Sequence, residues 1–366
     1  MSRAILYLVL IFSSVSFSQK RILIYHETNQ FRHTGAINAG ISMFEDFGVA
    51  NNFIVDNSQN SNVFTTGNLA LYDAVIFLNT SGNDETGSDG DLLSSSEKAA
   101  FENFILNGKG FIGIHAATDT YRDGSWDFYN ELVGGIVQTN PNHTNNNYNA
   151  NIEVKASHPI IDFLGPIGSV WNKNEEYYYW QNNGGQLSID NTVLLEVEET
   201  EGPNGIINSY DVARPITWYK ESVTYDDDNN SITPDVTINN IRSFYTALGH
   251  NGSDYSGNNN FRTMLLNATL WAIGNTLTIE EQIISDFKIV PNPVKSITTI
   301  QVEKTLGDIS VRLYTILGKE VLVKTINSSF LYNNEFSLNL SNLNSGVYLL
   351  KLSSKNVEKS IKLIKK

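Results

Sequence analysis

The chain has 366 residues, no cysteine, and 39 acidic against 25 basic residues, which gives a formal net charge of −14. The absence of cysteine excludes disulfides and thiol nucleophiles. The acidic balance argues against a nucleic-acid partner, because phosphate backbones are bound by clustered Lys and Arg, and the length suggests two domains.

The chain opens with a segment typical of a secretory signal peptide. Arg3 supplies a positive charge, residues 4–17 are almost entirely apolar or hydroxylic, and Ser16 and Ser18 occupy the −3 and −1 positions of a cleavage site. The segment is too short for a membrane span, and no other stretch approaches spanning length. We therefore predict that residues 1–18 are removed and that the mature protein works outside the cytoplasm.

Short apolar strands and amphipathic helices alternate along the first half of the chain. The expected strands lie at residues 21–26, 53–55, 74–78, 110–114 and, later, 243–248. The expected helices lie around 37–47 with Gly48 as C-cap, from the capping box Ser94-x-x-Glu97 to a stop at Gly108, and over 258–273. This alternation predicts a three-layer, flavodoxin-like α/β fold with a mostly parallel sheet. Residues 139–150 and 221–240 are expected to be loops.

Three histidines follow the carboxyl ends of separate predicted strands. His33 lies in the loop after the first strand, His115 directly follows the strand at 110–114, and His250 follows the strand at 243–248. Ligands of parallel α/β sheets bind outside the carboxyl ends of the strands. We therefore expect these three side chains to converge on one edge of the sheet.

The composition changes after about residue 276. Short alternating apolar runs follow one another to the C-terminus without a helical period, which predicts a small all-β sandwich. The expected organisation is a signal peptide at 1–18, an α/β domain at 19–275, a linker at 276–285 and the β-sandwich at 286–366.

The tail carries an ordered set of specific motifs. These are FKIVPNP, VRLYTILGKEV, LNSGVYLLKL and a lysine-rich end. The tail resembles the type A C-terminal sorting domain of the type IX secretion system of Bacteroidota. The resemblance implies that residues 286–366 engage that secretion machinery and that the protein is secreted or placed on the cell surface. The alternative is an adhesion or carbohydrate-binding module.

Seven motifs of the larger domain occur in the order of one family. They are Phe31-Arg32-His33, GIHAATD at 113–119, Leu132-Val133-Gly134-Gly135, Ser157-His158-Pro159, Trp171 with Glu175-Glu176-Tyr177-Tyr178, Pro215-Ile216-Thr217-Trp218, and Arg242 with Ala247-Leu248-Gly249-His250. Over about residues 20–274 the chain resembles the ThuA-like (trehalose utilisation) family. That family implies the class I glutamine-amidotransferase-like fold, with His115 at what looks like the position of the amidotransferase Cys.

Two segments depart from the family pattern. Members commonly follow the Gly-Gly pair with Phe and then His-Pro, whereas this chain has IVQTNPNHT, so that His143 is displaced. Residues 221–240 look like an insertion.

The chemistry available to this domain excludes amidotransfer, because there is no thiol to activate. His115, His250 and His33 are candidates for acid/base catalysis, since imidazole titrates near neutrality. Asp119 is expected to orient an imidazole or to bind sugar hydroxyls. Glu176 is a candidate second acid/base group or cation ligand.

Further residues are candidates for substrate binding. Arg242 would fix a substrate oxygen, Trp171, Tyr178 and Trp218 would offer aromatic faces for stacking on a sugar, and Glu175 would assist Glu176. The three histidines with a carboxylate are also ordinary ligands of zinc or a similar divalent metal. No His-x-x-His or His-Glu-x-x-His spacing is present, so the sequence leaves metal and acid/base chemistry open.

We predict a secreted protein that acts on a small carbohydrate, a disaccharide or keto-sugar, by histidine acid/base or metal-assisted chemistry. The alternative is a non-catalytic carbohydrate-binding or scaffold protein that kept the fold after its nucleophile was lost. No nucleic-acid partner and no membrane span are expected.

Overall fold

The computed structural model describes residues 19–82, 92–180, 187–202, 204–228, 235–257, 259–274, 287–302, 309–315, 319–327, 335–354 and 357–366. The chain divides into two compact units, one up to residue 276 and one from residue 277 to the C-terminus. The predicted signal peptide and linker lie outside the described residues, and the predicted domain limits stay predictions.

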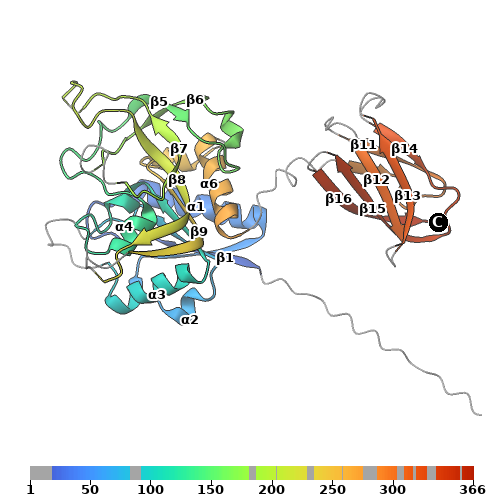
Figure 1. The fold of residues 1–366 in the computed structure, drawn as a ribbon, viewed down its shortest axis with the longest axis horizontal. Helices are drawn as coiled ribbons and strands as arrows, with labels where there is room; N and C mark the ends of the chain where they lie inside the picture. Colours follow the sequence, from blue (N-terminus) through green and yellow to red (C-terminus); the bar gives the residue numbers. More distant parts are fainter. Residues whose placement is uncertain are drawn as a thin grey trace, which may run out of the picture. The chain divides into compact units, whose positions relative to one another are not determined.

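The first unit is built on a nine-stranded sheet in the order β2-β1-β3-β4-β9-β8-β7-β5-β6 (Figure 1). The first five strands in this order run parallel, and the remaining four continue the sheet antiparallel. The strands are β1 (Lys20–Tyr25), β2 (Phe53–Ser58), β3 (Ala74–Leu78), β4 (Gly110–Ile114), β5 (Tyr148–Val154), β6 (Val170–Glu175), β7 (Thr192–Val197), β8 (Arg214–Tyr225) and β9 (Val236–Thr246).

Helices cover both faces of the parallel half. They are α1 (Thr34–Asn51), α2 (Thr66–Leu69), α3 (Ser95–Leu106), α4 (Asp127–Val133) and α6 (Asn260–Ala272), with 3-10 turns η1 (Ser61–Val63), η2 (His115–Asp119), η3 (Asp162–Leu164) and η4 (Gly252–Tyr255). In β4, Gly110 faces Ala272 of α6, whereas Gly113 faces Val133 of α4. Residues three apart on a strand point to opposite faces, so α6 and α4 lie on opposite sides.

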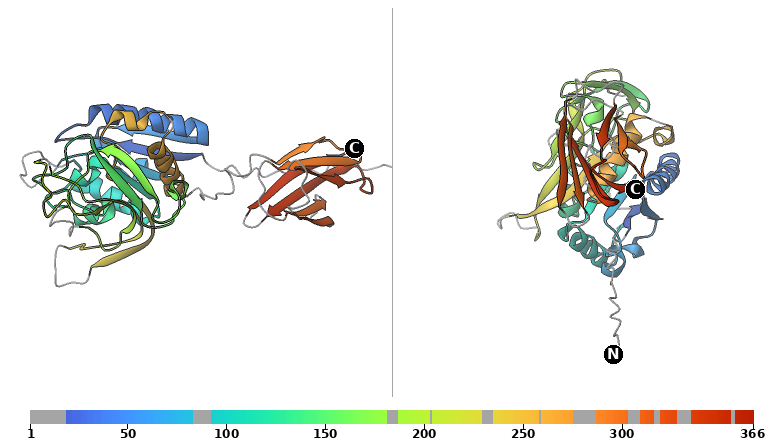
Figure 2. Two further views of the ribbon diagram at one scale, coloured as in Figure 1. Left: turned by 90° about the horizontal axis from the view of Figure 1, so that it is seen from above. Right: turned by 90° about the vertical axis from the view of Figure 1, so that its right-hand side faces the viewer.

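The remaining large helices complete these layers. On α1, Gly40 packs against Leu78, which lies on the α6 face. On α3, Phe101 packs against Phe111, which lies on the α4 face. Figure 2 (left) shows α1, in blue, along one side of this unit. The predicted three-layer α/β fold is confirmed, and the antiparallel extension is the part that the sequence pattern did not reveal.

Local sequence signals account for the ends of some helices. The Ser94–Glu97 capping box is present at the start of α3, and Gly108 after its end has φ +74°. The prediction that Gly48 caps α1 is wrong, because the helix continues to Asn51 and ends on the left-handed Asn52. Gly48 is instead required by packing, since a Cβ there would lie 2.6 Å from the carbonyl oxygen of Phe53.

The segment 221–240 is largely a hairpin rather than the expected loop. Strand β8 continues to Tyr225 and β9 begins at Val236, and the two pair as far as their outer ends. Residues 229–234 at the tip lie outside the described part. Among the described residues, no helix has both the length and the apolar character needed to cross a membrane.

The second unit is a small β-sandwich, as predicted. One antiparallel sheet contains β10 (Phe287–Val290), β11 (Ile297–Val302) and β14 (Glu335–Asn339). The other has the order β13 (Glu320–Ile326), β12 (Ile309–Thr315), β15 (Gly346–Ser354) and β16 (Val357–Lys365). Both sheets contribute to one apolar core, for example Ile300 from the first and Val311, Leu350 and Leu363 from the second.

Gly110→Ala should destabilise the first unit. The added Cβ would lie 2.4 Å from the backbone oxygen of Ala272, and relieving such a contact costs about 1–3 kcal/mol or more. Urea unfolding followed by tryptophan fluorescence measures this, since all five tryptophans precede residue 276. Gly67→Ala on α2 is the control, because nothing lies within 4 Å of its Cβ. Equal unfolding midpoints for the two variants would contradict the close packing of α6 on β4.

Candidate functional site

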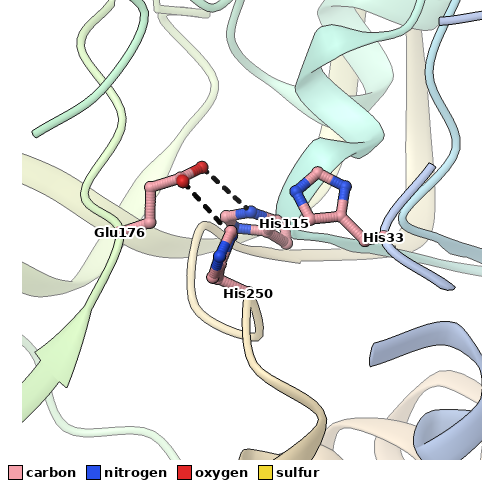
Figure 3. A group of neighbouring side chains, drawn as sticks. All are labelled: His33, His115, Glu176 and His250. Atoms are coloured by element: carbon pink, nitrogen blue, oxygen red, sulfur yellow. Dashed lines mark ion pairs between the residues drawn. The ribbon is translucent and has the colours of Figure 1, made fainter. Parts of the chain in front are cut away.

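Four side chains meet at the carboxyl edge of the parallel strands (Figure 3). His33 precedes α1 in the loop after β1, His115 directly follows β4, His250 follows β9, and Glu176 directly follows β6. Each offers one possible ligand atom, and these atoms all lie within 4.8 Å of one another. We call these four residues the histidine–glutamate cluster.

His115 occupies a sharp elbow at the end of β4. Its φ is +49°, a left-handed backbone conformation that is uncommon outside glycine and that Asn, Asp and His adopt more often than other residues. The elbow is clamped by Tyr245, whose hydroxyl donates to the His115 carbonyl at 2.9 Å and pairs with the Thr118 hydroxyl at 2.7 Å. The surrounding structure therefore fixes where this imidazole points.

One ring nitrogen of His115 is already engaged. Its Nδ1 lies 2.7 Å from the Ala247 carbonyl oxygen, and because a carbonyl only accepts, Nδ1 carries the proton. In the neutral ring, Nε2 then presents a lone pair. This buried Nε2 makes no hydrogen bond and points toward Glu176.

His33 joins the cluster from the start of α1. Its ring centroid lies 4.8 Å from that of His115 and 5.2 Å from that of His250. Although His33 occupies the N-cap position, its side chain makes no cap hydrogen bond. Burial, reinforced by His115 and His250, lowers the pKa of His33 to about 3. His33 is therefore neutral, with a lone pair available, at ordinary pH.

Glu176 is the buried anion of the cluster. Its carboxylate oxygens lie 3.5 Å from His115 Nε2 and 3.2 Å from His250 Nδ1. Burial alone would raise the pKa of Glu176, but its interactions with His115 and His250 outweigh burial and lower the pKa well below its usual range. Burial likewise opposes the charge on His250, yet Glu176 raises the pKa of that imidazole.

Glu175 positions the site rather than facing a substrate. Its fully buried carboxylate accepts hydrogen bonds from the backbone N–H of Gly249 at 2.9 Å and of His250 at 3.1 Å. Lys173 forms an ion pair with Glu175 at 3.0 Å and another with Asp254 at 2.7 Å. These contacts bring the end of β6 to the His250 loop, although β6 is at the far edge of the sheet.

Two more predicted residues lie at the rim of the cluster. The buried Tyr178 ring stacks on His115 at 4.5 Å with an interplanar angle of 19° and so forms a wall of the site. Asp119, at the end of η2, forms an ion pair with Arg122 at 2.9 Å. Its carboxylate is not among the converging ligand atoms.

The other three predicted binding residues lie elsewhere, which corrects their assignment. Arg242 pairs with Gly110 at the beginning of β4, the opposite end from His115, and donates to the Ala272 carbonyl. Trp218 is buried and donates through Nε1 to the Val133 carbonyl at 2.9 Å, so its faces pack in the core. Trp171 lies four residues before Glu175 on β6.

His143 is a site residue that the sequence analysis placed in doubt. Its Nδ1 donates to the Thr144 carbonyl at 2.6 Å and lies 3.5 Å from a Glu176 oxygen. An isolated bridge between His143 and Tyr178 holds it there. Because this pairing joins segments 35 residues apart, no local pattern in the sequence indicates it. His158, by contrast, packs between Tyr219 and Trp271, outside the cluster.

The arrangement suits two kinds of chemistry. Neutral imidazole nitrogens around a carboxylate are able to hold a divalent metal ion, and an imidazole paired with a carboxylate is able to transfer a proton. Both uses need the buried, pre-positioned geometry that the elbow and Glu175 provide.

Comparisons with known proteins identify a family for each of the two units. A family model for trehalose utilisation (ThuA) matches residues 21–272, and a model for the secretion system C-terminal sorting domain matches residues 288–366. Among solved structures, a ThuA-like protein from Bacteroides uniformis is 22% identical with a TM-score of 0.49, covering 69% of this chain and 91% of that one. A ThuA-like protein from Parabacteroides merdae is 16% identical with a TM-score of 0.48, covering 71% and 92%. None of the curated proteins matches the chain.

The two family matches confirm both resemblances drawn from the motifs. The sorting domain directs the protein through type IX export to the cell surface or the medium. The roles of the individual site residues stay predictions.

The low pKa of His33 should make the metal-free protein acid-sensitive. The pKa of His33 is about 3 in the folded chain and about 6.5 in an unfolded chain. Between these values the unfolded chain binds more protons, so the free energy of unfolding falls as the pH drops through this window. In His33→Asn this slope should be shallower by at most about 1.4 kcal/mol per pH unit. Urea titrations in EDTA between pH 7.5 and 4 measure it, and identical slopes would contradict a buried neutral His33.

Glu175→Gln should loosen the His250 loop. The amide removes the buried ion pair with Lys173, which keeps only Asp254, and accepts the backbone N–H groups of Gly249 and His250 less strongly, which costs about 3 kcal/mol. Hydrogen exchange at the amides of Gly249 and His250 should accelerate. Glu153→Gln is the matched control, since Glu153 is exposed and forms only a surface pair with Lys155. Unchanged exchange at Gly249 would refute the positioning role of Glu175.

Proposed function

We propose, because this chain belongs to the trehalose utilisation (ThuA) family, that its exported α/β domain is a carbohydrate-acting enzyme with a divalent metal at the histidine–glutamate cluster. One observation carries the proposal. His33 Nδ1, His115 Nε2 and His250 Nδ1 are all buried and make no hydrogen bond, and the four residues of the cluster each offer a ligand atom within 4.8 Å of the others. The family description, trehalose utilisation, supports a disaccharide as the substrate class, and a keto-sugar is part of the proposal alone.

The ligand set fits a zinc-like ion. A buried polar atom without a hydrogen bond costs about 1–3 kcal/mol, and three in one place need a common partner. The 3.2 and 3.5 Å separations between Glu176 oxygens and two imidazole nitrogens are close to the spacing of about 3.3 Å between neighbouring ligands of a tetrahedral zinc ion. The bond from His115 Nδ1 to the Ala247 carbonyl is the kind of outer contact that orients a metal-binding imidazole.

The protein's own groups complete the site. A divalent ion held there would act as a Lewis acid toward a sugar oxygen. Glu176, ionised, would offset part of the charge of the ion. His143, more exposed than the other histidines and beside Glu176, is placed to exchange a proton with a substrate hydroxyl.

A specific contact favours a second candidate, metal-free proton transfer. His250 Nδ1 lies 3.2 Å from a Glu176 oxygen, and this carboxylate raises the pKa of the imidazole. A protonated His250 would then act as a general acid. The two candidates differ in their response to chelators.

Zinc titration of the chelator-treated protein should distinguish them. Calorimetry should show one Zn²⁺ per chain, with affinity reduced on the order of 100-fold or more in His115→Ala and in His250→Ala. His158→Gln is the control, since His158 packs outside the cluster, and its zinc affinity should match the wild type. Zinc binding unaffected by His115→Ala would overturn the metal site. Sugar turnover that survives EDTA but not His250→Ala would support proton transfer, and saturable sugar binding without turnover would support the non-catalytic alternative.

A further inference from the structure

Phe31 is a large aromatic side chain exposed beside the histidine–glutamate cluster. Phe31 is 69% exposed as a residue, and among the described residues the other exposed phenylalanine is Phe163, at 40%. The Phe31 ring contacts His33, with centroids 4.9 Å apart. The His33 ring in turn contacts His115 and His250. Phe31 therefore borders the site on its accessible side.

The loop that carries Phe31 is fixed. The Phe31 carbonyl accepts a hydrogen bond from the Ser81 hydroxyl at 2.8 Å, and Asn29 donates to the Ser81 carbonyl at 2.8 Å. Arg32, the next residue, donates to the His26 carbonyl at the end of β1. An exposed ring on an anchored backbone loses little freedom when a ligand covers it, so the covered apolar area contributes to affinity.

The other aromatic rings near the cluster are not open to a ligand. Tyr178 is buried against His115, and Trp180 and Trp218 are buried in contact with each other. Tyr178 and Trp218, which were expected to stack on a sugar, therefore have no open face, and Trp171 lies four residues before Glu175 on β6. Phe31 is the aromatic face that remains beside the cluster.

A ligand that meets both Phe31 and the cluster must combine an apolar face with polar edges. A pyranose has this character, because its ring C–H groups form an apolar face and its hydroxyls point outward. The charges favour a neutral sugar over a phosphorylated one. Arg122 and Lys173 are already paired with carboxylates, Arg32 is engaged by the backbone carbonyl and the ring of His26, and the chain carries a net charge of −14.

We propose that Phe31 is the platform on which a neutral pyranoside stacks while its hydroxyls reach the histidine–glutamate cluster. This subsite deepens the proposed function and rests on it for the substrate class. Covering about 60 Å² of the ring corresponds to about a tenfold gain in affinity. Phe31→Ala should remove that gain and leave the cluster intact.

Calorimetry with trehalose, maltose, cellobiose and lactose tests the platform, and the sugar that binds wild type most tightly serves as the probe. Phe31→Ala should bind the probe about tenfold more weakly, whereas Phe31→Trp should retain binding and change its fluorescence on saturation. Phe163→Ala on η3 is the matched control and should bind as wild type does. Equal affinity of Phe31→Ala and wild type would overturn the proposal, as would failure of every sugar to bind wild type.

Zinc affinity separates this result from the proposed function. All Phe31 variants should bind Zn²⁺ as wild type does. If wild type binds no Zn²⁺ but binds the sugar with an affinity that depends on Phe31, the metal site is refuted and the Phe31 platform stands. If Zn²⁺ binds as expected but Phe31→Ala binds the sugar as tightly as wild type does, the Phe31 platform is refuted and the metal site stands.

Discussion

The buried Glu175 carboxylate joins the two halves of the sheet, and the site depends on that junction. The parallel half delivers His33, His115 and His250 to one edge through strand ends alone. Glu176 comes from β6, which is separated from β9 by β8, β7 and β5 in the sheet order. The sheet must bend for the end of β6 to reach the His250 loop. The hydrogen bonds that the backbone N–H groups of Gly249 and His250 donate to Glu175 hold the two together. The Glu175 carboxylate thus fixes the His250 loop, and because Glu176 is the next residue in the chain, the same contact holds Glu176 at the cluster.

Lys173 and Asp254 lower the free-energy cost of burying the Glu175 carboxylate. A lone buried carboxylate would be strongly disfavoured, but Glu175 has three backbone donors and an ammonium group. The same ammonium reaches Asp254 on η4, just beyond His250. Glu176 is therefore the carboxylate free to interact with the histidines, and the adjacent Glu-Glu pair divides into a structural member and a chemical one.

The sequence was sufficient for the parallel half and for the histidines. A buried strand is a local apolar run, and strand-end positions converge whatever the distance along the chain, so His33, His115 and His250 could be grouped in advance. The antiparallel half was not predictable in this way, because β5 and β8 are polar on one face and their register is set by distant partners. Arg242 was misplaced since β9 is long, and the four residue steps from Arg242 to Thr246 separate the two edges by about 13 Å. His143 depends on a bridge to Tyr178 that only the folded chain reveals.

Buried aromatic rings line one side of the histidine–glutamate cluster, and the other side is partly exposed to solvent. Tyr178 stacks on His115, and Tyr178 in turn packs edge-on against Trp180 within the core. This apolar wall lowers the local polarisability of the surroundings, which strengthens the attraction between Glu176 and the imidazoles. On the other side His143, His250 and Phe31 retain exposure. A ligand that reaches the exposed side of the cluster would meet Phe31 and His143 together.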